Sequence, residues 1–275
     1  MKLTKAEKRR LLPLEILGIV LGILWLIPFY LMLTNAFKNP DEIFAGVMGL
    51  PSSLIWQNFV VAFQELEFLK SLFNSVMITS LSIAVIVIFS SMGAYALARN
   101  PGRLSTILLF LFVAAMLVPF QAVMIPLTTI FGQANMLNGA GLIFIYLGFG
   151  CSLSIFLYHG ALKSIPKVLD EAATIDGANQ FQIFWHVIFP LLKPITVTVA
   201  ILNVIWIWND YLLPSLVLGQ ANATIPLKMF YFFGQFTTQW HLALAGLTIA
   251  IIPVIVFYFF AQKQIIKGVS EGAVK

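Results

Sequence analysis

The chain has 275 residues, of which 60% are hydrophobic and only 10% are charged, and its mean hydropathy is +0.95. A soluble domain carries about one quarter charged residues, so this composition excludes a soluble enzyme and predicts a polytopic membrane protein. The formal charge of +5 then reflects membrane topology rather than affinity for nucleic acid.

Six apolar runs are long enough to cross a bilayer as helices, which takes about 20 residues each. They cover approximately residues 16–33, 72–96, 104–130, 140–157, 195–217 and 242–261. The sequence therefore predicts an all-α protein with six transmembrane helices. In the second run, Ser75, Thr79 and Ser82 form a stripe that predicts close packing against another helix.

Two prolines lie in the third run, Pro119 and Pro126, with Gln121 between them. Proline removes a backbone hydrogen bond and clashes with the preceding turn, so this helix is predicted to be bent or broken. A broken helix in a membrane either lines a cavity or is buried inside the bundle. The sequence is compatible with a hinge of a transport pathway and with a kink accommodated by packing.

The lysines and arginines orient the six helices. With the N-terminus inside the cell, all but three of the 16 basic residues fall on inner segments, the exceptions being Lys38, Lys70 and Lys228. The positive-inside rule therefore places both termini in the cytoplasm. The basic N-terminus precedes a long apolar run without a cleavage signal, so the first helix is expected to be retained.

A polar segment at about 159–193 separates the fourth run from the fifth and falls on the cytoplasmic side. Ser164 as N-cap and Pro166 in the first turn predict the start of a short helix. Gly177 predicts its end, because glycine adopts a left-handed conformation at low cost. A second amphipathic helix is expected to follow, with its apolar face at i, i+3, i+4 and i+7. That face is formed by Phe181, Phe184, Trp185 and Ile188.

Two interpretations of the first of these helices remain open on physical grounds. It either lies on the lipid headgroups or docks into a partner protein. A headgroup helix usually has a basic polar face, whereas this one presents Asp170, Glu171 and Asp176 beside Lys163 and Lys167. In a docking helix the alanines allow close approach, and Glu171 accepts charge-assisted hydrogen bonds.

This segment resembles the cytoplasmic loop of ABC importer permeases. The resemblance rests on Glu171-Ala172-Ala173, on Gly177 and on Val187 followed by Phe189-Pro190. The family commonly has isoleucine and leucine where this chain has Val187 and Phe189, which is a conservative departure. The Ile175–Ala178 sequence Ile-Asp-Gly-Ala is similar to the carbohydrate branch of the family.

Further similarity to that branch extends along most of the chain, at residues 37–44, 74–75, 94–99, 164–167, 208–210 and 267–275. The ending Gly-Ala-Val-Lys resembles the subunit type represented by the smaller membrane subunit of the maltose transporter. The resemblance implies a type I ABC importer fold in a bacterial or archaeal cell membrane. Its function would be ATP-driven import of a carbohydrate, an oligosaccharide by preference.

The resemblance also implies partners: a second, homologous permease subunit, two copies of an ABC ATPase, an extracytoplasmic sugar-binding protein and membrane lipid. The chain lacks the Gly-x-x-x-x-Gly-Lys-Ser/Thr phosphate loop, so it is expected to be non-catalytic and without a cofactor. The residues implied to couple it to the ATPase are Glu171, Ala172, Ala173, Asp176 and Gly177. They would move with the ATPase in an alternating-access cycle.

Candidate pathway residues lie in the fifth run, where Asn203, Trp206 and Asp210 occur at i, i+3 and i+7 on one helix face. Asparagine and aspartate can hydrogen-bond sugar hydroxyls, and a tryptophan, Trp206 or Trp208, can stack on a sugar ring. The competing and favoured interpretation is hydrogen bonding between helices together with aromatic anchoring. The outer loop at about 219–239, which contains Lys228, suits either sugar displacement or packing on the membrane surface.

Three regions are expected: residues 1–69 with the N-terminal arm, first helix and first outer loop, residues 70–262 as an ABC type-1-like transmembrane domain containing the loop 159–193, and a cytoplasmic tail at 263–275. The three histidines are spread over different segments and predict no metal site.

Two other functions stay open, a permease of the same family for a non-sugar solute and a secondary transporter. A secondary transporter would usually show intramembrane carboxylates or an inverted repeat.

Overall fold

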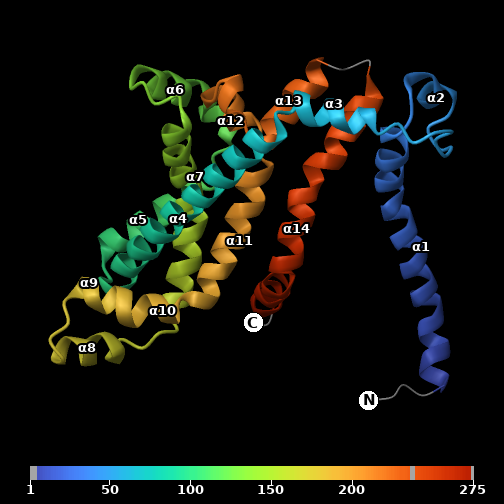
Figure 1. Cartoon of the computed structure of the whole chain (residues 1–275). Coiled ribbons are helices and arrows are strands. Elements are labelled where there is room, and N and C mark those ends of the chain that lie inside the picture. Colours follow the sequence, from blue (N-terminus) through green and yellow to red (C-terminus); the bar gives the residue numbers. More distant parts are fainter. Residues whose placement is uncertain (1–4, 236–238, 274–275) are drawn as a thin grey trace. The chain divides into compact units, whose positions relative to one another are not determined.

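The computed structural model describes residues 5–235 and 239–273, and within these ranges the regular structure is helical, with no strand. The helices form two compact units. Unit one comprises Met1–Glu67 and Tyr231–Pro253, and unit two comprises Phe68–Phe230 and Val254–Lys275. Two helices, α13 (Ile225–Gln235) and α14 (Trp240–Ala273), contribute to both units. Figure 1 labels the helices along the chain.

Unit one begins with the long helix α1 (Lys5–Ala36), followed by α2 (Pro40–Ala45) and α3 (Gln57–Glu65). Lys38, just after α1, is 1% exposed. Its ammonium group donates hydrogen bonds to Asn35 Oδ1 at 3.0 Å and to the Gly46 carbonyl at 2.9 Å. Asn58 of α3 donates to the carbonyls of Ala36 and Lys38, both at 2.9 Å. These bonds fasten the first outer loop to the end of α1.

Unit two is built around α4 (Phe68–Arg99) and α7 (Gly139–Leu162), which pack along each other and against α11 (Lys193–Asn209). Small hydroxyl residues allow this close approach. Ser75, Thr79 and Ser82 of α4 are all buried, which confirms the predicted packing stripe. Gly150 of α7 lies so close to α11 that a Cβ there would approach Asn203 Oδ1 to 2.8 Å.

The third apolar run is broken, as the prolines predict. It forms α5 (Arg103–Ala115) and α6 (Phe120–Gln133), bent by 103°. Pro119 precedes α6 as its N-cap, whereas Pro126 lies inside that helix. The residue before a proline is pushed out of the helical region, so Pro119 rather than Pro126 accounts for the break.

The fifth run differs from the prediction of one helix to residue 217. Helix α11 ends at Asn209, Asp210 is extended, and a short α12 (Leu212–Val217) follows. A 3-10 turn at Gln220–Asn222 leads to α13. The remaining elements lie between α7 and α11. They are α8 (Val168–Ile175), α9 (Gln180–Ile183), the π-helix η1 (Phe184–Ile188) and α10 (Phe189–Leu191).

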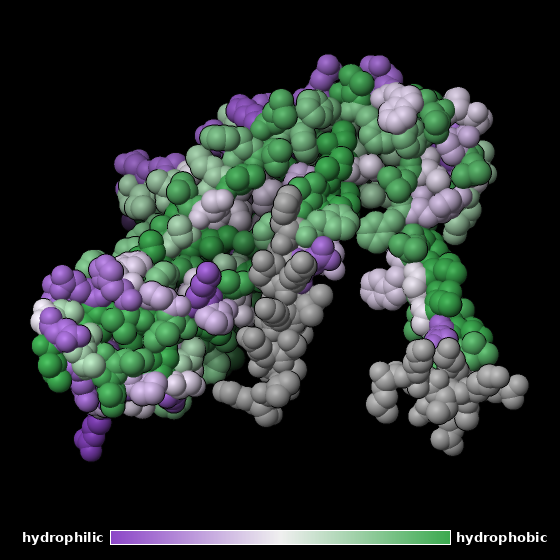
Figure 2. All heavy atoms as spheres, turned by 60° about the horizontal axis from the view of Figure 1, so that its bottom comes forward, coloured by the Kyte–Doolittle hydropathy of each residue, from purple (hydrophilic) through white to green (hydrophobic). Residues whose placement is uncertain are grey.

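The described helices are long and apolar enough for a multi-pass membrane protein. Four helices are long and apolar enough to cross a membrane, and the count reaches six if each of two bent pairs is one span. The four are Leu11–Ala36, Phe68–Arg99, Gly139–Leu162 and Trp240–Phe259. The second bent pair is Gln180–Leu191 with Lys193–Asn209, at 77°. Large hydrophobic side chains cover the helix sides, as Figure 2 shows. This is the predicted all-α fold with six spans.

Candidate functional site

Helix α8 lies at one end of unit two, beside α9 and the π-helix that follows it (Figure 1). Its start differs from the prediction. The helix begins at Val168 with Lys167 at the N-cap and no capping side chain, so Ser164 does not cap it and Pro166 lies before its first turn. Asp170 and Glu171 in the first turn nevertheless favour a helix start, since carboxylates stabilise the positive end of the helix dipole.

The end of α8 agrees with the prediction that Gly177 stops it. Gly177 has φ +84°, in the left-handed region. Its N–H donates to the Thr174 carbonyl and the Ala178 N–H donates to the Ala173 carbonyl, each at 3.0 Å. This pair of bonds is a Schellman motif. A Cβ at residue 177 would meet nothing within 4 Å, so the backbone conformation alone requires glycine.

Next, Asn179 and Gln182 close a reciprocal capping box that starts α9, with both hydrogen bonds at 2.9 Å. The sequence signal for this box, an asparagine followed three residues later by glutamine, is present in the chain. The two helices therefore form an elbow whose bend is specified by Gly177 and Asn179. We call residues 168–191 the elbow.

The second arm of the elbow, which runs from α9 through η1 to α10, buries a different set of side chains from the predicted apolar face. Ile183, Phe184 and Ile188 are buried, whereas Phe181 is 62% exposed. The reason is the π-helix, whose i to i+5 bonding adds a residue to the turn and shifts the register of the buried face. Ile183 and Ile188 are separated by that interval. Phe181 instead makes an edge contact with the Trp185 ring, at 6.0 Å between centroids.

The face that α8 turns toward its own chain is narrow. Ala173 and Ala178 pack against the buried cluster that includes Tyr158, Ile183 and Ile188. The spacing of Val168, Leu169, Ala172 and Ala173 predicts an apolar stripe on this helix. That prediction is wrong for Val168 and Leu169, which are 66% and 39% exposed, and for Ala172, which is also exposed. Of the α8 side chains, Ala173 packs on this cluster, and its small size allows the helix to lie close to it.

The opposite face of α8 is open. Glu171, Ala172, Asp176 and Gly177 are exposed, and Ile175 is 87% exposed. Figure 2 shows hydrophobic surface at this end of unit two, bordered by hydrophilic side chains. Exposed apolar residues rimmed by charge are typical of a protein interaction surface.

Asp170 is held by its own chain, which the sequence analysis missed. Its carboxylate pairs with Arg99 Nη2 at 2.8 Å and accepts hydrogen bonds from Tyr95 Oη at 2.7 Å and Arg99 Nε at 3.2 Å. Arg99 also donates to the Ile165 carbonyl. We call this group the latch. It ties α8 to the cytoplasmic end of α4, so Asp170 does not belong with the outward-facing acids. The signal was Arg99, a lone basic residue closing the second run.

The three pathway candidates do not share one open face. Asn203 is 5% exposed and donates hydrogen bonds to Ser154 Oγ at 3.2 Å and to the Val199 carbonyl at 2.8 Å. It therefore bridges α11 and α7. Trp206 is 40% exposed and makes a T-shaped contact with Tyr146, at 5.4 Å between ring centroids.

Asp210 lies beyond the end of α11, which corrects its placement on the same helix as Asn203 and Trp206. Its carboxylate accepts hydrogen bonds from Tyr146 Oη at 3.1 Å and from the Leu212 N–H at 3.0 Å. It thus caps α12 and anchors the chain break against α7. Among the described residues, no three histidine, cysteine, aspartate or glutamate side chains gather where a metal could bind.

Much of the expected outer loop at 219–239 is the helix α13. The Ile225 N–H donates to Ser75 Oγ at 2.8 Å, and Asn74 donates to the Ala223 carbonyl at 3.2 Å. Ile225 and Leu227 are buried. Thr237 and Thr238 lie outside the described residues. The first part of this segment is therefore packed structure rather than a projecting loop.

Comparison with known proteins gives consistent matches. The model of the family "Binding-protein-dependent transport system inner membrane component" matches residues 90–271. The "Probable starch degradation products transport system permease protein AmyC" of Thermoanaerobacterium thermosulfurigenes is 52% identical, over 95% of this chain and 96% of the relative. The "Melibiose/raffinose/stachyose import permease protein MelC" of Bacillus subtilis (strain 168) is 35% identical over the full length of both.

A solved structure is similar as well. It is described as the "Crystal structure of a bacterial ABC transporter involved in the import of the acidic polysaccharide alginate". One of its chains matches with a TM-score of 0.77 and 25% identity, over 96% of this chain and 99% of that one. The similarity therefore covers both compact units rather than a single helix pair.

Proposed function

The chain belongs to the family of binding-protein-dependent transport system inner membrane components, and we propose that it forms half of the translocation pathway of an ATP-driven importer for an oligosaccharide. As a permease it is a non-catalytic, multi-pass subunit of the cell membrane. The observation that supports an oligosaccharide as the transported solute is the 52% identity to a permease named for starch degradation products. A relative named for melibiose, raffinose and stachyose supports the same class.

The partners follow from this role. A second membrane subunit completes the pathway, two ATPase subunits drive it, and an extracytoplasmic binding protein delivers the sugar. The permease itself supplies docking surfaces and a route. This division of labour removes any need for a phosphate loop in this chain, and its sequence contains none.

The open face of α8 is the proposed ATPase contact. Glu171 and Asp176 are exposed, and neither carboxylate has a partner within the described part of the chain. Both are free to accept charge-assisted hydrogen bonds from basic side chains of a partner. Ala172 is small and exposed, so a partner surface can approach the helix backbone. Ala173 seats the helix on its own chain, and Gly177 sets the turn.

The latch is the proposed route by which movement of α8 reaches the membrane helices. A force on α8 passes through Asp170 to Arg99 and Tyr95 of α4. Helix α4 packs along α7 and α11. Closure of the ATPase pair would therefore move a connected set of helices between inward-open and outward-open arrangements.

Within the pathway, Trp206 is the proposed sugar contact. It is the one of the three candidates with substantial exposure, and Tyr146 packs against its ring in a T-shaped contact. An aromatic face held in this way can stack on a sugar ring. Asn203 and Asp210 are proposed to act in the pathway through positioning of α11 and α12, since their polar atoms are already bonded within the chain.

The cargo is tested by the binding protein that copurifies with the transporter. The complex is purified from its native membrane, and the small molecule released from the binding protein is identified by mass spectrometry. An oligosaccharide supports the proposal. An amino acid, polyamine or other non-sugar solute would overturn the cargo and leave the permease assignment in place.

A further inference from the structure

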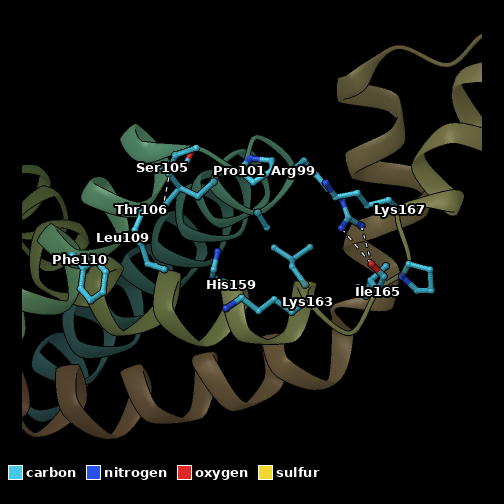
Figure 3. Close-up of a pocket in the computed structure, with 15 residues that line it drawn as sticks. Arg99, Pro101, Ser105, Thr106, Leu109, Phe110, His159, Lys163, Ile165 and Lys167 are labelled. Atoms are coloured by element: carbon cyan, nitrogen blue, oxygen red, sulfur yellow. Dashed lines mark hydrogen bonds between the residues drawn. The ribbon is translucent and has the colours of Figure 1, made fainter.

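A cleft lies at the cytoplasmic end of unit two, next to the latch, with which it shares Arg99 and Ile165. Its volume is about 610 Å³, and it is bounded by the end of α4, the start of α5, the end of α7 and the residues leading to α8. Figure 3 shows side chains from these elements around one space, with His159 on α7, Lys163 just after its end, and Ser105 and Thr106 on α5. The roles described above do not use this cleft.

The ionisable side chains that line the cleft are all basic. Four of its residues are basic and none is aspartate or glutamate, the four being Arg99, His159, Lys163 and Lys167. Arg99 is neutralised by Asp170. Lys163 and Lys167 are exposed, and within the described residues neither pairs with a carboxylate. The cleft therefore offers two uncompensated ammonium groups, which favour an anionic ligand.

The start of α5 adds to this field. The helix has 13 residues and begins after Gly102 without a capping side chain. Its first N–H groups carry partial positive charge and lack partners within the helix. The Ser105 and Thr106 hydroxyls donate to the Asn100 and Gly102 carbonyls. Their protons are therefore not available to a bound anion. The anion would be held by the lysines, with the backbone of α5 as support.

The α5 side chains that line the cleft change from polar to apolar along the helix. Ser105 and Thr106 lie at its cytoplasmic end, and Leu109 and Phe110 follow one helical turn deeper. Phe110 is 68% exposed. A site with cations at the membrane surface and apolar side chains beneath them matches a molecule with an anionic head and a hydrocarbon tail. A soluble anion would use the lysines but leave Leu109 and Phe110 without a role.

We propose that this cleft binds an anionic phospholipid of the inner leaflet, with its phosphate between Lys163 and Lys167 and an acyl chain along Leu109 and Phe110. The positive-inside rule accounts for lysines on this side of the membrane, but it does not require that two of them line one cleft together with Leu109 and Phe110. Because residues 163–167 lead directly into α8, a bound lipid restrains the base of the elbow.

The test measures lipid retention by the intact transporter complex. The complex is exchanged into equal amounts of phosphatidylglycerol and phosphatidylcholine with identical acyl chains, and retained lipid is counted by native mass spectrometry. We expect phosphatidylglycerol to be retained preferentially. Lys163→Gln should lower that preference about five-fold, the factor expected for one lysine at an anionic membrane surface.

The matched control is Lys193→Gln, which removes an exposed cytoplasmic lysine that does not line the cleft. It should leave the preference unchanged. Equal retention of the two lipids, or an equal loss in both variants, would overturn the proposal and indicate general surface attraction. Displacement of phosphatidylglycerol by millimolar inorganic phosphate would overturn it in favour of a soluble anion. Copurification of the ATPase with Lys163→Gln shows that the complex is intact, so the result is independent of the transported cargo.

Discussion

Two polar regions of this apolar chain differ in whether their polar side chains already have hydrogen-bond partners. On α8, Glu171 and Asp176 are exposed and have no partner within the described residues. At the junction of α7 with α11 and α12, Asn203 and Asp210 are hydrogen-bonded to Ser154 and Tyr146. A satisfied polar group stabilises the helix bundle, whereas an exposed and unpaired carboxylate is available to another molecule. The first region is therefore suited to docking, and the second to holding the helices together.

The largest expected effect comes from reversing the charge on the open face. Glu171→Lys places a cation where a basic partner surface is proposed to dock, and like-charge contact costs several kcal/mol. We expect copurification of the ATPase to fall by about a hundred-fold or more, and sugar uptake to be lost. Quantitative immunoblotting of the purified complex measures the first, and uptake of labelled sugar measures the second.

The control is Glu65→Lys, which reverses an exposed acid on α3 in unit one. It should retain the ATPase and the uptake rate. Normal uptake in Glu171→Lys would show that the open face of α8 is not a coupling surface, and the contrast between the two polar regions would then have no functional meaning.

A second prediction separates Asp170 from its neighbour Glu171. Asp170→Asn weakens the latch but leaves the open face unchanged. The ATPase should remain bound, while the number of sugar molecules imported per ATP hydrolysed falls, by about ten-fold if the weakened ion pair is worth about 1.4 kcal/mol. Parallel measurement of ATP hydrolysis and uptake in proteoliposomes gives this ratio.

Rescue distinguishes a specific latch from a general loss of stability. The double variant Arg99→Asp with Asp170→Arg restores opposite charges across the same pair of positions and should recover part of the coupling. If Asp170→Asn lost the ATPase as completely as Glu171→Lys does, Asp170 would be a docking residue and its separation from Glu171 would be wrong.

A third prediction concerns the turn that presents the open face. Gly177→Ala forces a non-glycine residue to φ +84°, at a cost of about 1–2 kcal/mol. Uptake should fall several-fold as the α8–α9 turn distorts. Gly160→Ala is the matched control, because a Cβ there also meets nothing within 4 Å and the residue lies within α7. Equal uptake in the two variants would remove the argument that the left-handed turn positions the elbow.

The smallest effects are expected in the second region. Asn203→Ala removes one interhelical hydrogen bond, worth about 0.6 kcal/mol in a membrane protein, and should lower thermal stability slightly without altering the KM for uptake. Trp206→Ala should instead raise that KM several-fold at nearly unchanged stability, because the exposed ring is the proposed sugar contact. A raised KM in Asn203→Ala alone would reverse these two assignments.

The sequence predicted well wherever the information is local. Gly177 and Pro119 act on the backbone at or next to their own positions, and both breaks occur where those residues predict them. The sequence predicted less well which side chains of a helix are buried. Phe181 was expected to be buried, but the π-helix changes the periodicity and exposes it. An aromatic at helical spacing does not reveal whether the helix keeps its 3.6-residue turn.

By itself, the amino-acid sequence determined the membrane class, the six apolar runs, the orientation and the position of the elbow, because run length, lysine placement and glycine or proline conformation are local properties. Only the tertiary structure decided which polar groups are free. Asp170 meets Tyr95 and Arg99, 75 and 71 residues away, and Asp210 meets Tyr146, 64 residues away. Side chains so distant in the chain become neighbours only when the helices pack, and that packing leaves Glu171 and Asp176 available to a partner.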